Sequence, residues 1–162
     1  MAVVLGTALA TSAAQAQDIK IAYNGDMSGT AVAELGQAAR WGFEAAIEDI
    51  NKNGGLLGRK VVPVIRDDLG TPPKSIQNMT ELIDNEKVVG VVGPANSGNA
   101  LAWLHIPQAA KIPVIGSTAT ATEITTRYAK EPQNYMFRVS MVDREQVALL
   151  AAYAVKASKN KK

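Results

Sequence analysis

Two short polar segments contain the residues whose types and spacing could bind a small molecule. The first spans residues 93–98, with the sequence GPANSG, and has the glycine spacing of a phosphate-binding P-loop. A P-loop also needs a lysine and then a serine or threonine after the second glycine, but Asn99 and Ala100 occupy those positions. We therefore expect no nucleoside triphosphate chemistry at this segment.

The backbone of the same segment offers another kind of chemistry. The N–H groups of residues 97–99 lie at a predicted helix start, where an anion can bind, and a carboxylate suits such a site as well as a phosphate. Ser97 and Gly98 are the candidate residues. Alternatively, Ser97 serves only as the N-cap of the helix, and the spacing leaves both interpretations open.

The second polar segment spans residues 116–123, with the sequence GSTATATE. Its hydroxyls and carbonyls, from Thr118, Ala119 and Thr120 among others, can accept hydrogen bonds from an ammonium group. An ordinary turn, in which Thr122 caps a short helical turn, is the alternative. Together, an anion-holding segment and a hydroxyl-rich segment would suit a zwitterion such as an amino acid.

The rest of the sequence does not favour catalysis. His105 is the only histidine, lacks an adjacent acidic residue, and there is no cysteine to provide a thiol or a metal ligand. Asp67 and Asp68 are adjacent at a strand end, so we expect hydrogen bonds to the following loop rather than a shared proton. We expect no catalytic residue, no metal, no cofactor and no enzymatic activity.

Composition predicts a single soluble globular domain, since 47% of the 162 residues are hydrophobic and 20% are charged. The formal charge of +2 depends on four lysines within residues 156–162, whereas residues 17–155 have a net charge of −2. We expect no nucleic-acid partner, because the body of the chain has no basic stripe. The lysine-rich end, residues 158–162, is interpreted as a solvated basic tail.

The first sixteen residues form a short uncharged apolar run that ends in small residues, Ala14-Gln15-Ala16. This pattern is typical of the end of a secretory signal peptide, and the run is too short to span a bilayer. No lysine or arginine precedes it, so we hypothesise that Met1 lies within a longer signal. We expect cleavage after Ala16, export to the periplasm and no stable membrane insertion. A buried N-terminal helix or strand is the alternative.

Along the mature chain, residues 17–157, β-like and helical patterns alternate. Strands are predicted over residues 19–24, 61–65, 87–93, 113–115 and 135–139, and helices over residues 31–53, 72–83, 97–110 (with a kink at Pro107) and 143–157. This order predicts an α/β three-layer sandwich with a parallel sheet. Ligands of such folds bind beyond the carboxyl ends of the strands, where both polar segments lie.

From Asp18 to about Val155, the sequence resembles the N-terminal lobe of ABC-transporter substrate-binding proteins of the branched-chain amino acid type. The matching segments are Met27-Ser28-Gly29, Gly36, Ile50-Asn51, Gly54-Gly55, Gly58-Arg59, Asp67-Asp68, Val91 to Gly98, Ile112 to Ile115, Thr118-Ala119-Thr120, Phe137-Arg138, Asp143 and Gln146. The resemblance implies a Rossmann-like lobe of the type I periplasmic-binding fold. It also implies ABC-transporter permease subunits as partners and an amino acid, or a related carboxylate or amide, as ligand.

The resemblance implies roles for particular residues. Ser97 would bind the ligand carboxylate with its hydroxyl and backbone N–H, and Thr120 would donate to it as well. The Thr118 carbonyl would accept from the ammonium group, while Tyr23 and Met27 would line the wall facing the ligand side chain. The second lobe of the family is absent from this sequence. We therefore hypothesise a truncated product that folds partly and binds weakly, if at all.

Two other functions remain open at this point. The same lobe occurs in ligand-sensing domains of receptors and amide-responsive regulators. A small nucleotide-binding α/β enzyme is a weaker alternative, because it needs a catalytic base or a phosphate-binding lysine near residues 93–99 and the sequence shows neither.

Overall fold

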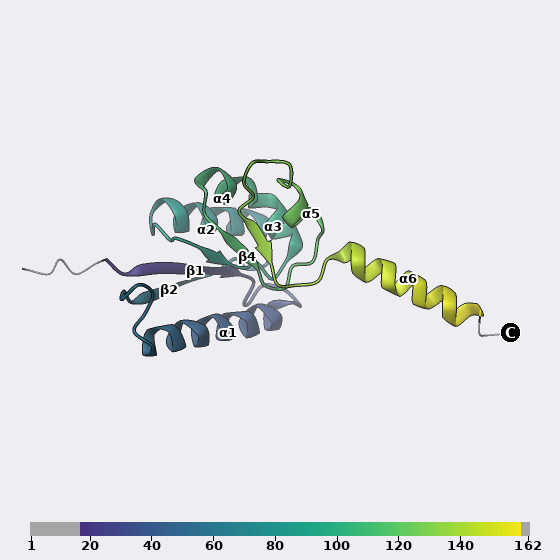
Figure 1. The fold of residues 1–162 in the computed structure, drawn as a ribbon, viewed down its shortest axis with the longest axis horizontal. Helices are drawn as coiled ribbons and strands as arrows, with labels where there is room; N and C mark the ends of the chain where they lie inside the picture. Colours follow the sequence, from purple (N-terminus) through teal and green to yellow (C-terminus); the bar gives the residue numbers. More distant parts are fainter. Residues whose placement is uncertain (1–16, 160–162) are drawn as a thin grey trace, which may run out of the picture.

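The computed structural model describes residues 17–159, so the expected signal peptide and the last three residues of the basic tail lie outside the described part. Strands and helices alternate along most of the chain (Figure 1). In chain order, the elements are β1 (Ile19–Gly25), α1 (Ala33–Lys52), β2 (Val61–Asp67), α2 (Pro72–Asp84), β3 (Val91–Val92), α3 (Ser97–Trp103), α4 (His105–Ala110), β4 (Val114–Gly116), α5 (Glu123–Thr126), β5 (Met136–Arg138) and α6 (Asp143–Lys159).

The five strands form one parallel sheet in the order β2-β1-β3-β4-β5. Helix α1 covers one face of the sheet, and α2, α3, α4 and α5 lie on the other (Figure 1). The predicted α/β three-layer sandwich is therefore confirmed. Because all strands run in the same direction, the loops that follow them lie at one edge of the sheet.

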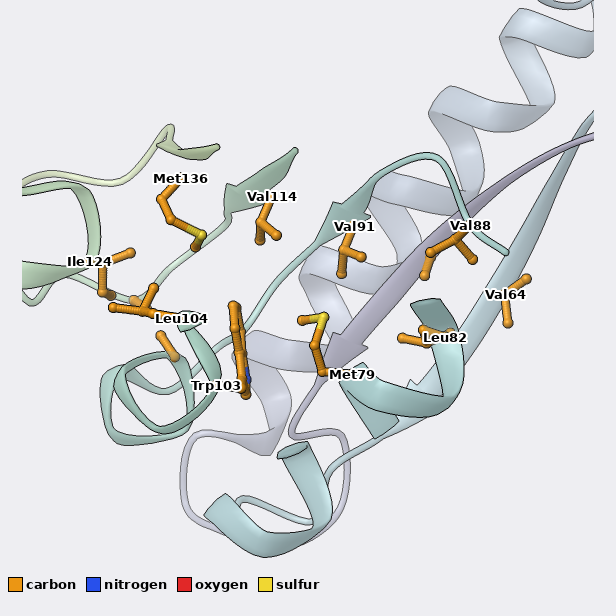
Figure 2. Close-up of a cluster of buried hydrophobic side chains, with 13 residues drawn as sticks. Val64, Met79, Leu82, Val88, Val91, Trp103, Leu104, Val114, Ile124 and Met136 are labelled. Carbon is orange, nitrogen blue, oxygen red and sulfur yellow. The ribbon is translucent and has the colours of Figure 1, made fainter. Parts of the chain in front are cut away.

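Each face of the sheet has its own core. The larger core lies beneath α2 to α5 and centres on Trp103, Met79 and Leu104, which are fully buried (Figure 2). The smaller core lies beneath α1, where Phe43 and Ile47 pack with residues of β1 and β2. Burial of each such side chain stabilises the fold by about 1.5–3 kcal/mol, which explains why both faces of β1 are covered.

The structure corrects three details of the predicted elements. The strand expected over residues 87–93 is limited to Val91 and Val92, because Lys87 has a φ of 56° and Val89 is exposed. The helix predicted over residues 97–110 is divided at Leu104 into α3 and α4, although Leu104 keeps helical φ and ψ, because Pro107 has no N–H to bond the carbonyl of Trp103. On α1, Leu35 is exposed rather than part of the core.

Helix α6 projects away from the three layers (Figure 1). Its apolar side chains face solvent among the described residues, including Val147, Leu149, Leu150, Tyr153 and Val155. A helix that is apolar on several sides is normally enclosed by other protein. Within residues 17–159, no helix combines the length and the apolar composition needed to cross a bilayer.

Candidate functional site

The two polar segments identified from the sequence lie side by side at the carboxyl edge of the sheet. The Ser97 Oγ accepts hydrogen bonds from the backbone N–H groups of Thr120 and Ala121, both at 3.1 Å. In the reverse direction, the Thr118 hydroxyl donates to the Ala95 carbonyl at 3.1 Å, and the Ser117 hydroxyl donates to the Pro94 carbonyl at 3.3 Å. We call residues 94–97 and 117–121 the hydroxyl turns.

Several polar atoms of the hydroxyl turns remain available. Ser97 is half-buried, and its hydroxyl accepts two bonds but keeps its own proton free to donate. Among the described residues, the Ser97 N–H, the Thr120 hydroxyl and the Thr118 carbonyl have no hydrogen-bond partner. These three donors, counting the Ser97 hydroxyl, and the one carbonyl acceptor are neutral groups, neither strong acids nor strong bases.

The start of α3 differs from both interpretations of the sequence. Asn96, not Ser97, is the N-cap, and its side-chain oxygen accepts from the N–H groups of Gly98 at 2.8 Å and Asn99 at 3.3 Å. Two of the three N–H groups expected to hold an anion are therefore already paired. The Ser97 N–H alone remains, and Gly98 contributes to the turn geometry rather than a free donor. Asparagine is among the preferred N-cap residues, so the residue type at position 96 is itself a signal for this cap.

Tyr23 does not line an open wall, which corrects the expectation drawn from the resemblance. Its side chain is fully buried beneath α1, stacks obliquely on Phe43 at 6.0 Å between ring centroids, and donates from its hydroxyl to the Gly36 carbonyl at 2.8 Å. The reason is side-chain alternation along β1, which sends Tyr23 to the α1 face and Asn24 to the α2 face. Burial, followed by the charges of three nearby aspartates, raises the pKa of Tyr23 to about 12.

Met27 lies in the same core as Tyr23 and is 8% exposed. Its N–H donates to Asp67 at 3.0 Å, and its carbonyl accepts from the Gln37 side chain at 2.7 Å. These contacts give Met27 a packing role within this lobe. The expected contact between Met27 and a ligand side chain stays a prediction.

A second polar region lies at the same edge of the sheet, where the loops after β1 and β2 meet. One carboxylate oxygen from each of Asp26, Asp67 and Asp68 lies within 4.8 Å of the others. Asp26 accepts from the Gly29 N–H at 2.7 Å and from the Thr30 hydroxyl. We call residues 26–30 and 67–70 the acidic loops.

The other two aspartates are also bound within this region. Asp67 accepts from the N–H groups of Met27 and Leu69, and Asp68 accepts from the Gly70 N–H at 2.9 Å. The expectation that both carboxylates bond the following loop is thus confirmed. Asp68 also accepts from the Asn99 side chain at 2.8 Å, which ties α3 to the acidic loops.

The two adjacent aspartates have opposite pKa shifts. Burial favours the neutral acid at Asp67, but hydrogen bonds from Ser28, Met27 and Leu69 outweigh it and hold its pKa below the ordinary value. At Asp68, burial dominates over hydrogen bonds from Asn99, Ser75 and Gly70, so its pKa is raised. The difference follows from exposure, because Asp68 is fully buried and Asp67 is half-buried.

Comparison with known proteins places the chain in a family. A profile of the periplasmic binding protein family matches residues 18–162. The Leu/Ile/Val-binding protein BraC3 of Rhizobium johnstonii is 30% identical over 145 residues, which cover 90% of this chain and 38% of the relative. The chain thus spans well under half the length of the curated relatives that it matches.

Solved structures show the same lobe. The branched-chain amino acid transporter substrate-binding protein LivJ from Streptococcus pneumoniae, in complex with isoleucine, superposes with a TM-score of 0.71 at 31% identity, covering 78% of this chain and 35% of that chain. A solute-binding protein of R. palustris in complex with 4-hydroxybenzoate has a TM-score of 0.64 at 34% identity, with 78% and 32% covered. The fold, the family profile and these relatives agree, and the chain belongs to the periplasmic binding protein family, resembling its branched-chain amino acid-binding members.

Proposed function

We propose that this chain supplies one lobe of an extracytoplasmic solute-binding component of an ABC importer, and that the hydroxyl turns hold the charged groups of a branched-chain or related amino acid. The observation that carries the proposal is the position of Ser97. Its hydroxyl joins the two turns by accepting two backbone N–H groups and keeps its proton for a ligand. The family relationship supports a binding role rather than an enzymatic one.

In this proposal, the carboxylate accepts hydrogen bonds from the Ser97 hydroxyl, the Ser97 N–H and the Thr120 hydroxyl. The ammonium group donates to the Thr118 carbonyl. Neutral donors suit the binding of a carboxylate because they form charge-assisted hydrogen bonds to it. A charged partner would also have to lose its water on binding, and that desolvation would reduce the free energy gained from the ion pair.

The two liganded relatives help to separate these contacts. Isoleucine and 4-hydroxybenzoate, named with the S. pneumoniae and R. palustris proteins, share a carboxylate, but only isoleucine has an ammonium group. Carboxylate binding at Ser97 and Thr120 would therefore be common to both ligand classes. The availability of the Thr118 carbonyl is the feature that favours an amino acid here.

A second lobe completes the proposal. Ligand closure between two lobes requires contacts from both, so one lobe alone should bind weakly, with a Kd on the order of 1 mM or above. The exposed apolar side chains of α6 support the idea that further protein encloses this helix. Residues 17–157 would form the first lobe, after a signal peptide at residues 1–16 that directs the protein to the periplasm, where transporter permease subunits would be its partners.

The test is a titration of the ¹⁵N-labelled chain with L-leucine, followed by NMR. We expect the amide signals of residues 97, 98 and 118–120 to shift, with an affinity in the millimolar range. Two analogues assign the contacts: 4-methylpentanoate lacks the ammonium group and isoamylamine lacks the carboxylate. Each should bind at least about tenfold more weakly than leucine, because each loses charge-assisted hydrogen bonds.

Two variants provide the controls. Ser97→Ala removes the hydroxyl and should abolish the shifts, whereas Ser158→Ala, near the end of α6, should leave them unchanged. Leucine shifts that map outside the hydroxyl turns and residue 98, or that survive in Ser97→Ala, would contradict the proposed site. Micromolar binding by this chain in calorimetry would contradict the need for a second lobe.

A further inference from the structure

The end of β5 and the residues that follow it contact the 119–121 turn from the side opposite Ser97. Ser140 donates from its hydroxyl to the Ala119 carbonyl at 2.7 Å. Arg138 donates from Nη1 to the Thr120 carbonyl at 3.0 Å and from Nη2 to the Ala121 carbonyl at 2.6 Å. The three consecutive carbonyls of the turn are thus all bonded by two side chains of one short segment.

These contacts fix two peptide groups of the turn, because each group is hydrogen-bonded at both its oxygen and its nitrogen. The Ala119 carbonyl and the Thr120 N–H belong to one planar trans peptide group, so they point in opposite directions. That group is held by Ser140 at its oxygen and by Ser97 at its nitrogen. In the next group, Arg138 binds the Thr120 carbonyl and Ser97 binds the Ala121 N–H. Rotation of either plane would break a bond on each side.

Arginine is chemically suited to this position. Its planar guanidinium donates to several acceptors in fixed directions, whereas lysine offers one ammonium nitrogen. Strand β5 brings Arg138 next to the turn, because Arg138 is the last residue of β5 and pairs in register with Gly116 of β4, directly before the turn. Among the described residues, Arg138 forms no salt bridge. Its Nη1 and Nη2 donate to the turn and, at 3.2 Å, to the Thr125 hydroxyl, whereas its buried Nε has no partner.

The same segment leads into α6. The Asp143 N–H, at the first residue of that helix, donates to the Thr120 carbonyl at 3.0 Å, beside the bond from Arg138. The turn that contacts the proposed ligand is therefore bonded to the start of the helix that projects from the lobe. A change in the direction of α6 would act on the Thr120 peptide plane.

We infer that Arg138 is a positioning residue, which sets the orientation of the Thr120–Ala121 peptide and so presents Thr118, Thr120 and Ser97 to the ligand. The inference rests on the proposed function for its last step. Arg138 bonds the turn from the side away from Ser97, so its effect on binding is exerted through the carbonyls of Thr120 and Ala121.

The experiment compares three variants of the whole chain by amide hydrogen exchange and by leucine titration. Arg138→Met keeps an apolar side chain of similar length and removes the hydrogen-bond donors. Arg138→Lys keeps the positive charge but lacks the planar guanidinium group. Arg127→Met is the matched control, because Arg127 lies on the neighbouring helix end and bonds Leu101 and Glu123 rather than the turn. The amides of Val91 and Val114 report on the sheet core.

For Arg138→Met, we expect the Thr120 and Ala121 amides to exchange about tenfold faster, while the Val91 and Val114 amides keep their protection. Leucine affinity should fall by about tenfold in the same variant. Arg138→Lys should give an intermediate loss in both measurements, and the confinement of faster exchange to the turn amides separates this effect from a contribution to overall stability. Arg127→Met should match the unmodified chain.

Unchanged exchange of Thr120 and Ala121 in Arg138→Met would overturn the inference. If Arg138→Met loses protection throughout the core, the exchange of Arg138→Lys tests the inference instead. Faster exchange confined to the turn amides of Arg138→Lys supports the inference, and unchanged exchange of those amides overturns it. Failure of the proposed function has a different signature, because leucine would then shift no turn signal in the unmodified chain while the exchange results would still report on Arg138.

Discussion

The acidic loops and the hydroxyl turns lie at the same edge of the sheet but differ in how their polar atoms are paired. In the acidic loops, carboxylates accept hydrogen bonds from nearby backbone and hydroxyl donors, and Asp68 is fully buried. In the hydroxyl turns, Ser97, Thr118 and Thr120 keep donors or acceptors without a partner among the described residues. The strongest charges therefore maintain the fold, whereas neutral groups are available for binding.

The comparison predicts that the acidic loops control stability. Replacing Asp68 with alanine removes the acceptor for the Gly70 N–H, the Ser75 hydroxyl and the Asn99 amide. We expect Asp68→Ala to lower the free energy of unfolding by about 4 kcal/mol, because buried donors are left unpaired. Urea denaturation followed by circular dichroism measures the change.

The matched change in the hydroxyl turns is Ser97→Ala, which should lower the free energy of unfolding by about 1 kcal/mol. Equal losses for the two variants would break the distinction between the regions. Asp68→Asn tests the same distinction more finely, because its amide keeps one acceptor oxygen. This variant should recover roughly half of the stability that Asp68→Ala loses.

A second prediction concerns the packing of α1 against the acidic loops. A Cβ added to Gly36 would lie 1.7 Å from the Asp26 carbonyl oxygen, so the helix and the loop would have to separate. We expect Gly36→Ala to lower the free energy of unfolding by about 3 kcal/mol. The same denaturation experiment tests it.

Gly42 provides the control on the same helix. A Cβ at Gly42 meets no atom within 4 Å, and alanine has the higher helix propensity. Gly42→Ala should therefore stabilise the protein by up to about 1 kcal/mol. A destabilisation by Gly36→Ala no larger than 0.5 kcal/mol, on the order of an ordinary surface substitution, would show that the loop can move away freely.

The third prediction uses the pKa of Tyr23. Its ordinary value is 10.0, and in the folded protein it is about 12, raised by burial and by the neighbouring aspartates. A raised pKa gives stability that is fully present below pH 10 and is lost as the pH rises toward 12, because the unfolded chain ionises first. The loss in the free energy of unfolding should reach at most about 3 kcal/mol.

Urea denaturation at several pH values between 9 and 12 measures this dependence. Tyr23→Phe isolates it from the titration of lysines, since only the difference between the two proteins is attributed to Tyr23. Parallel stability curves for the two proteins across this range would show that folding does not raise the pKa of Tyr23.

Much of the architecture was predictable from the sequence because it depends on local signals. The strand expected over residues 19–24 and the helices expected over residues 31–53 and 72–83 appear close to their predicted bounds, as β1, α1 and α2. The meeting of the hydroxyl turns followed from a rule of topology, since the carboxyl ends of neighbouring parallel strands share an edge.

The remainder depends on contacts between distant residues. Alternation shows that Tyr23 and Asn24 face opposite sides of the sheet, but not that helices bury both of them. A run of apolar residues at 87–93 does not reveal that only two of them pair as a strand. Likewise, Arg138 is one arginine in a short strand, and its contact with the turn appears only when β4 and β5 are adjacent.

The exposed side chains of α6 have a practical consequence for handling the protein. The side chains of Leu149, Leu150 and Tyr153 expose apolar surface on a single helix, so the purified chain should self-associate as its concentration rises. Titrations that need high protein concentrations would then report on aggregates as well as on monomers. Sedimentation at several dilutions, or polar replacements at these three positions, would identify the conditions in which the lobe is monodisperse.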